Sequence, residues 1–229
     1  MSLTDSVKKI GFRKAYEYLD KDPDTNIPKL MEWVDRFAGS GPDSFPRQRA
    51  AIRNVISDPD NNWYRLIRSM WTDIDDGVRR AFFENFILNG NLIGWKKQEE
   101  NREKYGCNIP WAILLDPTSA CTGGWAAEYG SKLNLSFDEI DDIITQGKDL
   151  GIYIYIYTGG EPMVRKDDLI ALCNKHHDCE FLCFTNATLI DEAFADEMLR
   201  VKNFVPAISV EGFEEATDSR RGEGGFQKV

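Results

Sequence analysis

The chain has 229 residues, of which 42% are hydrophobic and 12% aromatic. This apolar share can form a packed core and excludes a mainly disordered chain. Asp and Glu outnumber Lys and Arg by 38 to 28, and the resulting net charge of −10 argues against a nucleic acid or an anionic membrane as the main partner.

The N-terminal segment and the cysteines indicate where the protein resides. Residues 1–22 alternate charged and apolar side chains and contain no apolar signal-peptide segment. No apolar run approaches the roughly 18 residues that a membrane helix needs. The five cysteines are an odd number in a chain without an export signal, which favours reduced thiols. We therefore expect a cytoplasmic protein with no membrane partner.

Residues 1–106 have the periodicity of helices. Apolar side chains recur every three to four positions in 27–37 and 63–71, and no strand pattern occurs before Cys107. A turn cluster at 58–62 separates two of these stretches. We expect this region to be all-helical and to pack or cap without chemistry of its own.

The pattern changes at Cys107, where apolar runs begin that predict strands. These runs lie at 109–115, 152–158, 180–185 and 204–210. The second run alternates Ile and Tyr and therefore has no polar face, which is typical of a parallel sheet covered on both sides.

Helices are expected between these strands. Ser136 and Glu139 have the spacing of a capping box, and Gly151 stands where a helix commonly ends. Two further helices are predicted at 166–175 and 191–202. An alternation of strand and helix favours parallel strands joined by right-handed crossovers.

The number of strands sets the expected fold class. A closed eight-unit barrel needs about 250 residues, more than the chain has after Cys107. We therefore predict an α/β fold, a partial (β/α) barrel with about four parallel strands and an unpaired edge. This domain would span 107–229 and follow the helical region 1–106.

Polar and flexible residues follow each predicted strand at the point where the apolar run stops. They are Asp116 to Trp125, Thr158 to Pro162, Thr185 to Thr188, and Ser209 to Gly212. Strand ends are often rich in turn residues, but Gly-Gly followed by Glu-Pro exceeds what a turn requires. Two glycines let the backbone approach a ligand closely, and a carboxylate behind them can accept hydrogen bonds from an ammonium group. Since parallel strands deliver their ends to one edge of a sheet, a site is expected there.

In these motifs, residues 109–229 resemble the N-terminal part of a radical S-adenosylmethionine (radical SAM) enzyme of the iron–sulfur oxidoreductase type. Thr158 to Pro162 matches the family's GGEP motif, which binds the amino group of the methionine moiety, and Ser209 to Glu211 matches a fourth-strand motif that contacts the ribose. An arginine from the segment 218–222 would reach the methionine carboxylate. The resemblance assigns no catalytic residue and implies these cofactor-binding residues: Thr158, Gly159, Gly160, Glu161, Pro162, Asn186, Ser209, Glu211, and Arg220 or Arg221.

The resemblance also implies a [4Fe–4S] cluster, an electron donor and a substrate that the sequence does not identify. The family carries Cys-x3-Cys-x2-Cys after its first strand, and three thiolates hold the cluster. Here the loop contains a single cysteine, Cys121, as the expected metal ligand, and Gly124 stands where the last cysteine of the motif would be. Either the loop is degenerate or the sequence as written lacks loop residues. We expect no stable cluster in the chain as written.

Two other interpretations of the chain compete with a radical SAM enzyme, and one local motif could suggest a metal site. The first is a non-catalytic, degenerate relative whose helical region is an interaction module. The second is a phosphate-binding α/β protein that uses Thr158 to Gly160 as an anion nest, which Glu161 disfavours by its charge. The local motif is the C-x2-H-H-x-C run 173–179, which could suggest zinc. Cysteines in the core and two histidines at a helix end, His176 and His177, are the better explanation.

Overall fold

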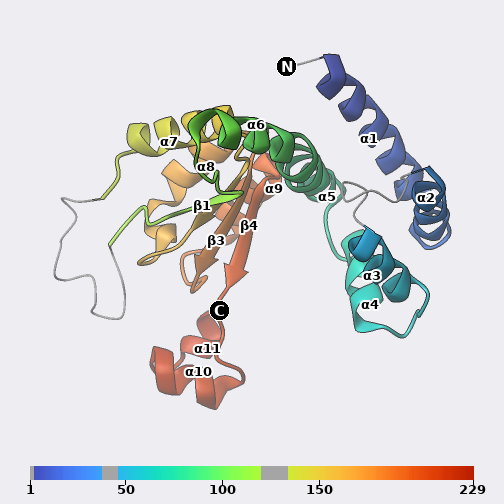
Figure 1. Ribbon diagram of the computed structural model, residues 1–229. Coiled ribbons are helices and arrows are strands. Elements are labelled where there is room, and N and C mark those ends of the chain that lie inside the picture. Colours follow the sequence, from blue (N-terminus) through green and yellow to red (C-terminus); the bar gives the residue numbers. More distant parts are fainter. Residues whose placement is uncertain (1–2, 38–45, 120–133) are drawn as a thin grey trace. The chain divides into compact units, whose positions relative to one another are not determined.

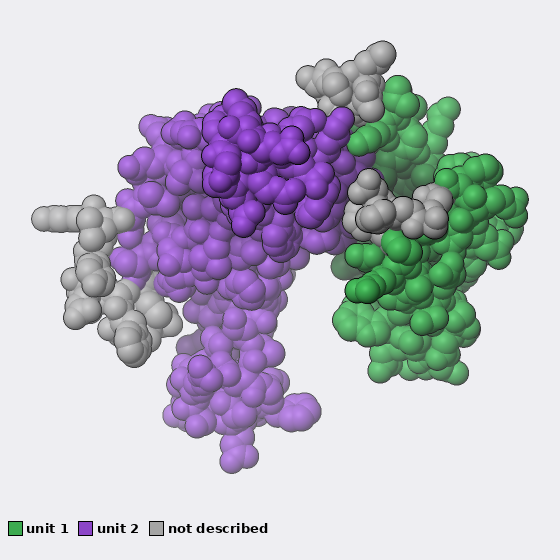
Figure 2. All heavy atoms as spheres, viewed as in Figure 1, with its two compact units in different colours: residues 1–79 green, residues 80–229 purple. Residues whose placement is uncertain are grey.

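The computed structural model describes residues 3–37, 46–119 and 134–229. The chain divides into two compact units, Met1–Arg79 and Arg80–Val229 (Figure 2). Among the described residues, no helix is long and apolar enough to cross a membrane.

The first unit is helical, as its periodicity predicts. Its helices are α1 (Leu3–Lys21), α2 (Pro23–Phe37), α3 (Pro46–Ile56), α4 (Asn62–Thr72) and the start of α5 (Asp76–Phe82). A buried arginine, Arg79, organises the unit, because its guanidinium donates to the carboxylates of Asp20 and Asp76 at 2.7 Å and to the hydroxyl of Tyr16 at 3.1 Å. These bonds compensate the burial of the charge and tie α1 to α5.

The second unit contains the predicted parallel sheet. Within the described residues its strands are β1 (Ala112–Leu115), β2 (Ile154–Tyr157), β3 (Glu180–Thr185) and β4 (Phe204–Ile208), and they lie side by side in the order β1-β2-β3-β4 (Figure 1). All three neighbouring pairs are parallel. This confirms the prediction of a partial α/β barrel. The first strand begins at Ala112 rather than at Ile109, since Pro110 has no N–H to donate to a ladder.

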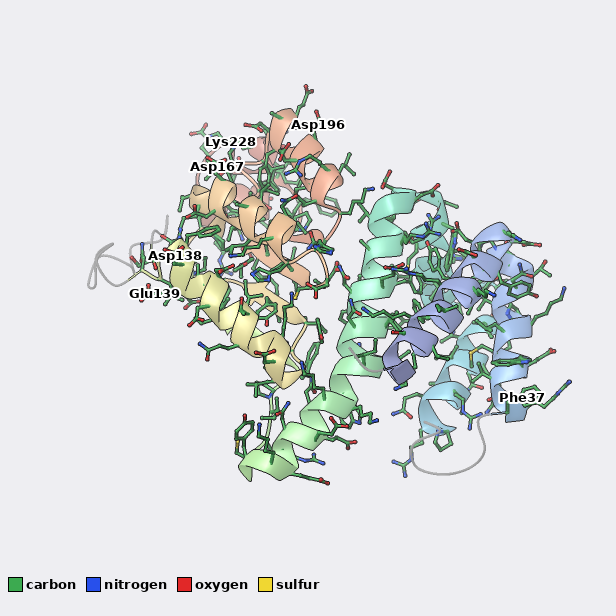
Figure 3. All side chains as sticks on the ribbon, turned by 90° about the horizontal axis from the view of Figure 1, so that it is seen from above. Phe37, Asp138, Glu139, Asp167, Asp196 and Lys228 are labelled. Carbon is green, nitrogen blue, oxygen red and sulfur yellow. The ribbon has the colours of Figure 1, made fainter. Side chains whose placement is uncertain are left out.

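Three helices cover one face of the sheet. They are α7 (Phe137–Leu150), α8 (Lys166–Lys175) and α9 (Glu192–Val201). The core between helices and sheet includes Tyr155, Tyr157 and Phe181, packed with Ile144 and Leu172. Figure 3 looks down on this helical layer and labels exposed acidic side chains on it, namely Asp138, Glu139, Asp167 and Asp196.

The predicted caps of α7 are present and explain its limits. The Ser136 hydroxyl accepts from the Glu139 N–H, and the Glu139 carboxylate accepts from the Ser136 N–H at 2.8 Å. Gly151 ends the helix with φ of 95°, a left-handed conformation that glycine adopts without a steric cost.

The opposite face of the sheet is partly open. Leu114 and Phe184 lie on it with 60% and 46% of their surface exposed. In a closed barrel this face would turn inward. The sheet is therefore an open segment of a barrel and not a closed one.

Residues 83–105 are helical but pack with the sheet. They form the π-helix η2 (Phe83–Gly94) and α6 (Trp95–Tyr105), both in the second compact unit. Buried amide side chains dock them, since Asn85 donates to the carbonyls of His177 and Cys179, and Gln98 donates to that of Gly151. The predicted division of the chain into functional domains at residue 106 stays a prediction.

Candidate functional site

The ends of β2, β3 and β4 surround a cavity of about 380 Å³. This volume lies in the usual range of small-molecule sites. The cavity is lined by Thr158, Gly159, Gly160, Glu161, Phe184, Thr185, Asn186, Ser209 and Arg221. Parallel strands bring the segments that follow them to one edge of the sheet, so residues about 60 positions apart in sequence meet here.

Seven of the ten residues that the resemblance assigns to the cofactor line this cavity, and three do not. Pro162 is buried at the first position of the 3-10 turn η5 (Pro162–Arg165). Glu211 and Arg220 lie outside the lining. Thr185, which the sequence placed at the third strand end without assigning it to the cofactor, also lines the cavity, and so does Phe184, which the sequence interpretation did not select.

The turn after β2 lies directly against the segment after β1. Gly159 has φ of 91°, and a Cβ on it would lie 2.9 Å from the Cβ of Asp116. The N–H groups of Thr158 and Gly160 donate to the carbonyls of Leu115 and Thr118 at 3.0 and 3.2 Å. Only glycine satisfies both the left-handed conformation and the close approach at position 159.

Glu161 is a buried carboxylate whose two oxygens are both engaged. It is 6% exposed. Its Oε1 accepts from the hydroxyl of Thr185 at 2.6 Å and from the N–H of Met163 at 3.1 Å, and its Oε2 accepts from the N–H of Asn186 at 2.9 Å. The carboxylate thus joins the end of β2 to the end of β3.

The end of β3 has an unusual backbone that these bonds hold. The Thr185 hydroxyl accepts from the N–H of Ala187, which has φ of 60°. A left-handed conformation at a non-glycine residue costs on the order of 1 kcal/mol or more and is common at functional sites. The Asn186 side-chain oxygen accepts from the N–H and hydroxyl of Thr188, so its amide nitrogen is the group that remains for a ligand.

Two arginines approach Glu211 beyond β4 in different ways. Arg221 donates to one carboxylate oxygen at 2.7 Å, and Arg220 lies 3.3 Å from the other. The Arg220 side chain is 75% exposed and that of Arg221 is 25% exposed. Arg221 lines the cavity and Arg220 does not. The described lining of the cavity therefore contains one cationic side chain, Arg221, and one carboxylate, Glu161.

The predicted metal ligand Cys121 lies outside the described residues. Among the residues that the structure describes, no group of three His, Cys, Asp or Glu side chains could hold a metal ion. Cys173, Cys179 and Cys183 are buried core thiols, and burial raises the pKa of Cys183 to about 12, with Glu161 adding to the shift. Such thiols do not ionise readily and cannot replace the missing thiolates of the loop.

The C-x2-H-H-x-C run shows no zinc geometry within the described residues. His176 is buried, and its Nε2 lies 2.9 Å from the carboxylate of Asp141. Burial lowers the pKa of His176, and the Asp141 carboxylate opposes that shift. Cys173, Cys179 and His176 are buried, and His176 follows the last residue of α8.

Comparisons with known proteins agree with the motifs. A model of the radical SAM superfamily matches residues 107–229. An uncharacterized protein of Archaeoglobus fulgidus is 28% identical over an alignment of 141 residues, and the match covers 58% of this chain and 33% of that protein. The chain therefore spans about a third of the length of this curated relative.

Solved structures of SuiB from Streptococcus suis are also similar. The structure bound to S-adenosylmethionine has a TM-score of 0.45 and 18% identity, and the match covers 65% of this chain and 41% of SuiB. The structure bound to the precursor peptide SuiA has a TM-score of 0.44 and 20% identity, with 54% of this chain and 30% of SuiB covered.

Proposed function

The chain belongs to the radical SAM superfamily, and we propose that it binds S-adenosylmethionine in the cavity at the ends of β2, β3 and β4. The observation that carries this proposal is that residues predicted from separate strand ends line one cavity. Those residues are Thr158, Gly159, Gly160, Glu161, Asn186, Ser209 and Arg221.

The chemistry of the lining fits the two charged ends of the methionine moiety. The guanidinium of Arg221 can donate to a carboxylate, and the carbonyls of the Thr158 to Gly160 turn can accept from an ammonium group. The charge of Glu161 favours the same ammonium, and each of its oxygens can accept more than one bond. Ser209 and Asn186 supply neutral donors and acceptors of the kind that ribose hydroxyls need.

A [4Fe–4S] cluster does not fit the residues present. Such a cluster needs three protein thiolates in this family, and the loop between Asp116 and Leu135 contains one cysteine. The activity that family membership suggests for the whole protein is reductive cleavage of the cofactor, followed by hydrogen abstraction from a substrate. It requires further thiolates and an electron donor, so we assign to this chain cofactor binding and no radical-forming step. Anaerobic reconstitution with iron and sulfide should leave iron far below four per chain.

Isothermal titration of the full chain with S-adenosylmethionine and S-adenosylhomocysteine tests the proposal. We expect one-to-one binding that Arg221→Ala weakens by about tenfold or more, because a charge-assisted bond is lost. Arg200→Ala is the matched control, since Arg200 pairs with Glu197 on the surface of α9. No binding of either ligand at millimolar concentration would overturn the proposal.

One observation favours the alternative, a non-catalytic chain whose helical region is an interaction module. On α2, Trp33 and Phe37 are 59% and 65% exposed with ring centroids 5.2 Å apart, and on α4 Trp63 is 67% exposed. Exposed aromatic side chains are enriched at protein interfaces.

The cytoplasmic location expected from the sequence also stays a prediction.

A further inference from the structure

Arg165 joins segments that lie far apart in the sequence. It is the last residue of η5, four positions after Glu161, and its side chain is 16% exposed. Its Nη1 donates to the carbonyls of Pro117 and Leu135 at 2.6 and 2.5 Å. Its Nε and Nη2 donate to one carboxylate oxygen of Asp168 at 3.0 and 2.8 Å.

The two carbonyls flank the loop between β1 and α7. A second tie joins the same two ends, because the N–H of Ser119 donates to the side-chain oxygen of Asn134 at 3.0 Å. A hydrogen bond from the Gly160 N–H to the Thr118 carbonyl joins the β1 end of the loop to the turn that lines the cavity. Both ends of this loop are thereby held to each other and to the turn that lines the cavity.

An arginine suits this position for a geometric reason. Its planar guanidinium presents five donors in a fixed fork, whereas a lysine presents three donors around one point. Asp168 neutralises the charge, which lowers the cost of holding the cation in a largely buried place. Without Arg165, the carbonyls of Pro117 and Leu135 would lose a charge-assisted donor where water has little access.

We infer that Arg165 is a positioning residue that fixes both ends of the β1–α7 loop against the cofactor-binding turn. The expected effect of Arg165 on cofactor affinity rests on the proposed function. The expected effect of Arg165 on the backbone of the loop ends does not. Arg165 is not part of the cavity lining, so it acts through Pro117, Leu135 and the Gly160 to Thr118 bond.

The experiment compares amide hydrogen exchange, resolved by residue, in the full chain and in Arg165→Ala. Exchange at Ser119 and Gly160 should become about tenfold faster or more, while amides in the centre of β3 keep their rates. Affinity for S-adenosylhomocysteine should fall by about tenfold. Arg165→Lys keeps the charge without the fork and should not restore the slow exchange. Arg200→Ala should leave all these values unchanged.

The results separate this inference from the proposed function. Unchanged exchange at Ser119 and Gly160 in folded Arg165→Ala would overturn the inference, whatever the ligand does. If the wild-type chain fails to bind S-adenosylhomocysteine, the proposed function fails while the exchange comparison still decides the role of Arg165. Should Arg165→Ala not fold, Asp168→Asn releases the guanidinium from its carboxylate and should raise exchange at the same two amides by a smaller factor. Unchanged rates in Asp168→Asn would then contradict the inference.

Discussion

The hydroxyl of Thr185 donates a 2.6 Å hydrogen bond to Oε1 of Glu161, and through it the end of β3 is fastened to the end of β2. The two residues are separated by two further elements of the chain, η5 and α8. The Glu161 carboxylate is buried, and the protein supplies it with three donors, the Thr185 hydroxyl and the N–H groups of Met163 and Asn186. The shape of the cavity therefore depends on a residue whose role is visible only in three dimensions.

Replacing Thr185 by Val should destabilise the protein by about 1–3 kcal/mol, because a buried carboxylate loses a donor while the side-chain volume stays nearly the same. Thr185→Ser retains the hydroxyl and should recover most of the loss. Urea denaturation measures both variants, and affinity for S-adenosylhomocysteine should follow the same order. Equal stability of the Val and Ser variants would show that the bond has no energetic role.

Gly159→Ala should cost more than the strain of a left-handed alanine alone. Its φ is 91°, and the added Cβ would lie 2.9 Å from the Cβ and Cγ of Asp116. Gly106→Ala is the matched control, since Gly106 is left-handed with φ of 67° and a Cβ on it would meet nothing within 4 Å. We expect about 1 kcal/mol at Gly106 and clearly more at Gly159, together with weaker cofactor binding only at Gly159. Similar losses of stability at both positions would contradict the close approach.

Two buried tyrosines on β2 differ in what their hydroxyls contact. Tyr155 lies 3.0 and 3.1 Å from the carbonyls of Ile144 and Ile152 and donates to them, whereas the Tyr157 hydroxyl has no partner among the described residues. Tyr155→Phe should therefore cost about 1–2 kcal/mol, and Tyr157→Phe should be neutral or stabilising. Thermal unfolding distinguishes the two, and a larger loss for Tyr157→Phe would refute the assignment.

Glu180 should make stability depend on pH. Burial raises the pKa of Glu180 to about 8, and the nearby Asn85 side chain opposes this shift. Among the described residues, neither carboxylate oxygen of Glu180 has a hydrogen-bond partner. The pKa of Glu180 in the folded chain exceeds its value in the unfolded chain. The protonated carboxyl therefore contributes its full share to the free energy of unfolding below about pH 4.5, and this contribution is lost as the pH rises through about 8.

Glu180→Gln imitates the protonated carboxyl and should be more stable than the wild type by a margin that grows from pH 5 to pH 8. Above pH 8 the margin should level off at a few kcal/mol. Chemical denaturation at several pH values measures it, with the exposed Glu223→Gln as the control. A margin that does not change with pH would show that the carboxyl ionises normally.

Local patterns were sufficient to predict the sheet and much of the cavity. The alternation of Ile and Tyr in β2 predicts a strand buried on both faces, and the Ser136 to Glu139 spacing predicts the start of α7. The glycines after β2 predict a close backbone approach, which Gly159 makes to Asp116. In each case the signal lies within a few consecutive residues.

Other features depend on contacts that no local pattern encodes. Arg165 contacts carbonyls 48 and 30 positions away, so its sequence neighbours do not reveal its role. Glu180 opens a strand and would be expected at the surface, yet it is buried near Asn85 of η2. The helices at 83–105 have helical periodicity like α1 to α4. Contacts made in the folded chain, among them the amide bonds of Asn85 and Gln98, associate them with the sheet unit.

The most direct test of the central claim is residue-resolved amide exchange of the full chain with and without saturating S-adenosylmethionine. The account predicts slower exchange at Gly159, Gly160, Asn186 and Ser209, with the helices of residues 3–72 unaffected. Saturable binding that protects only the helical unit, or no protection at any of those four amides, would contradict it.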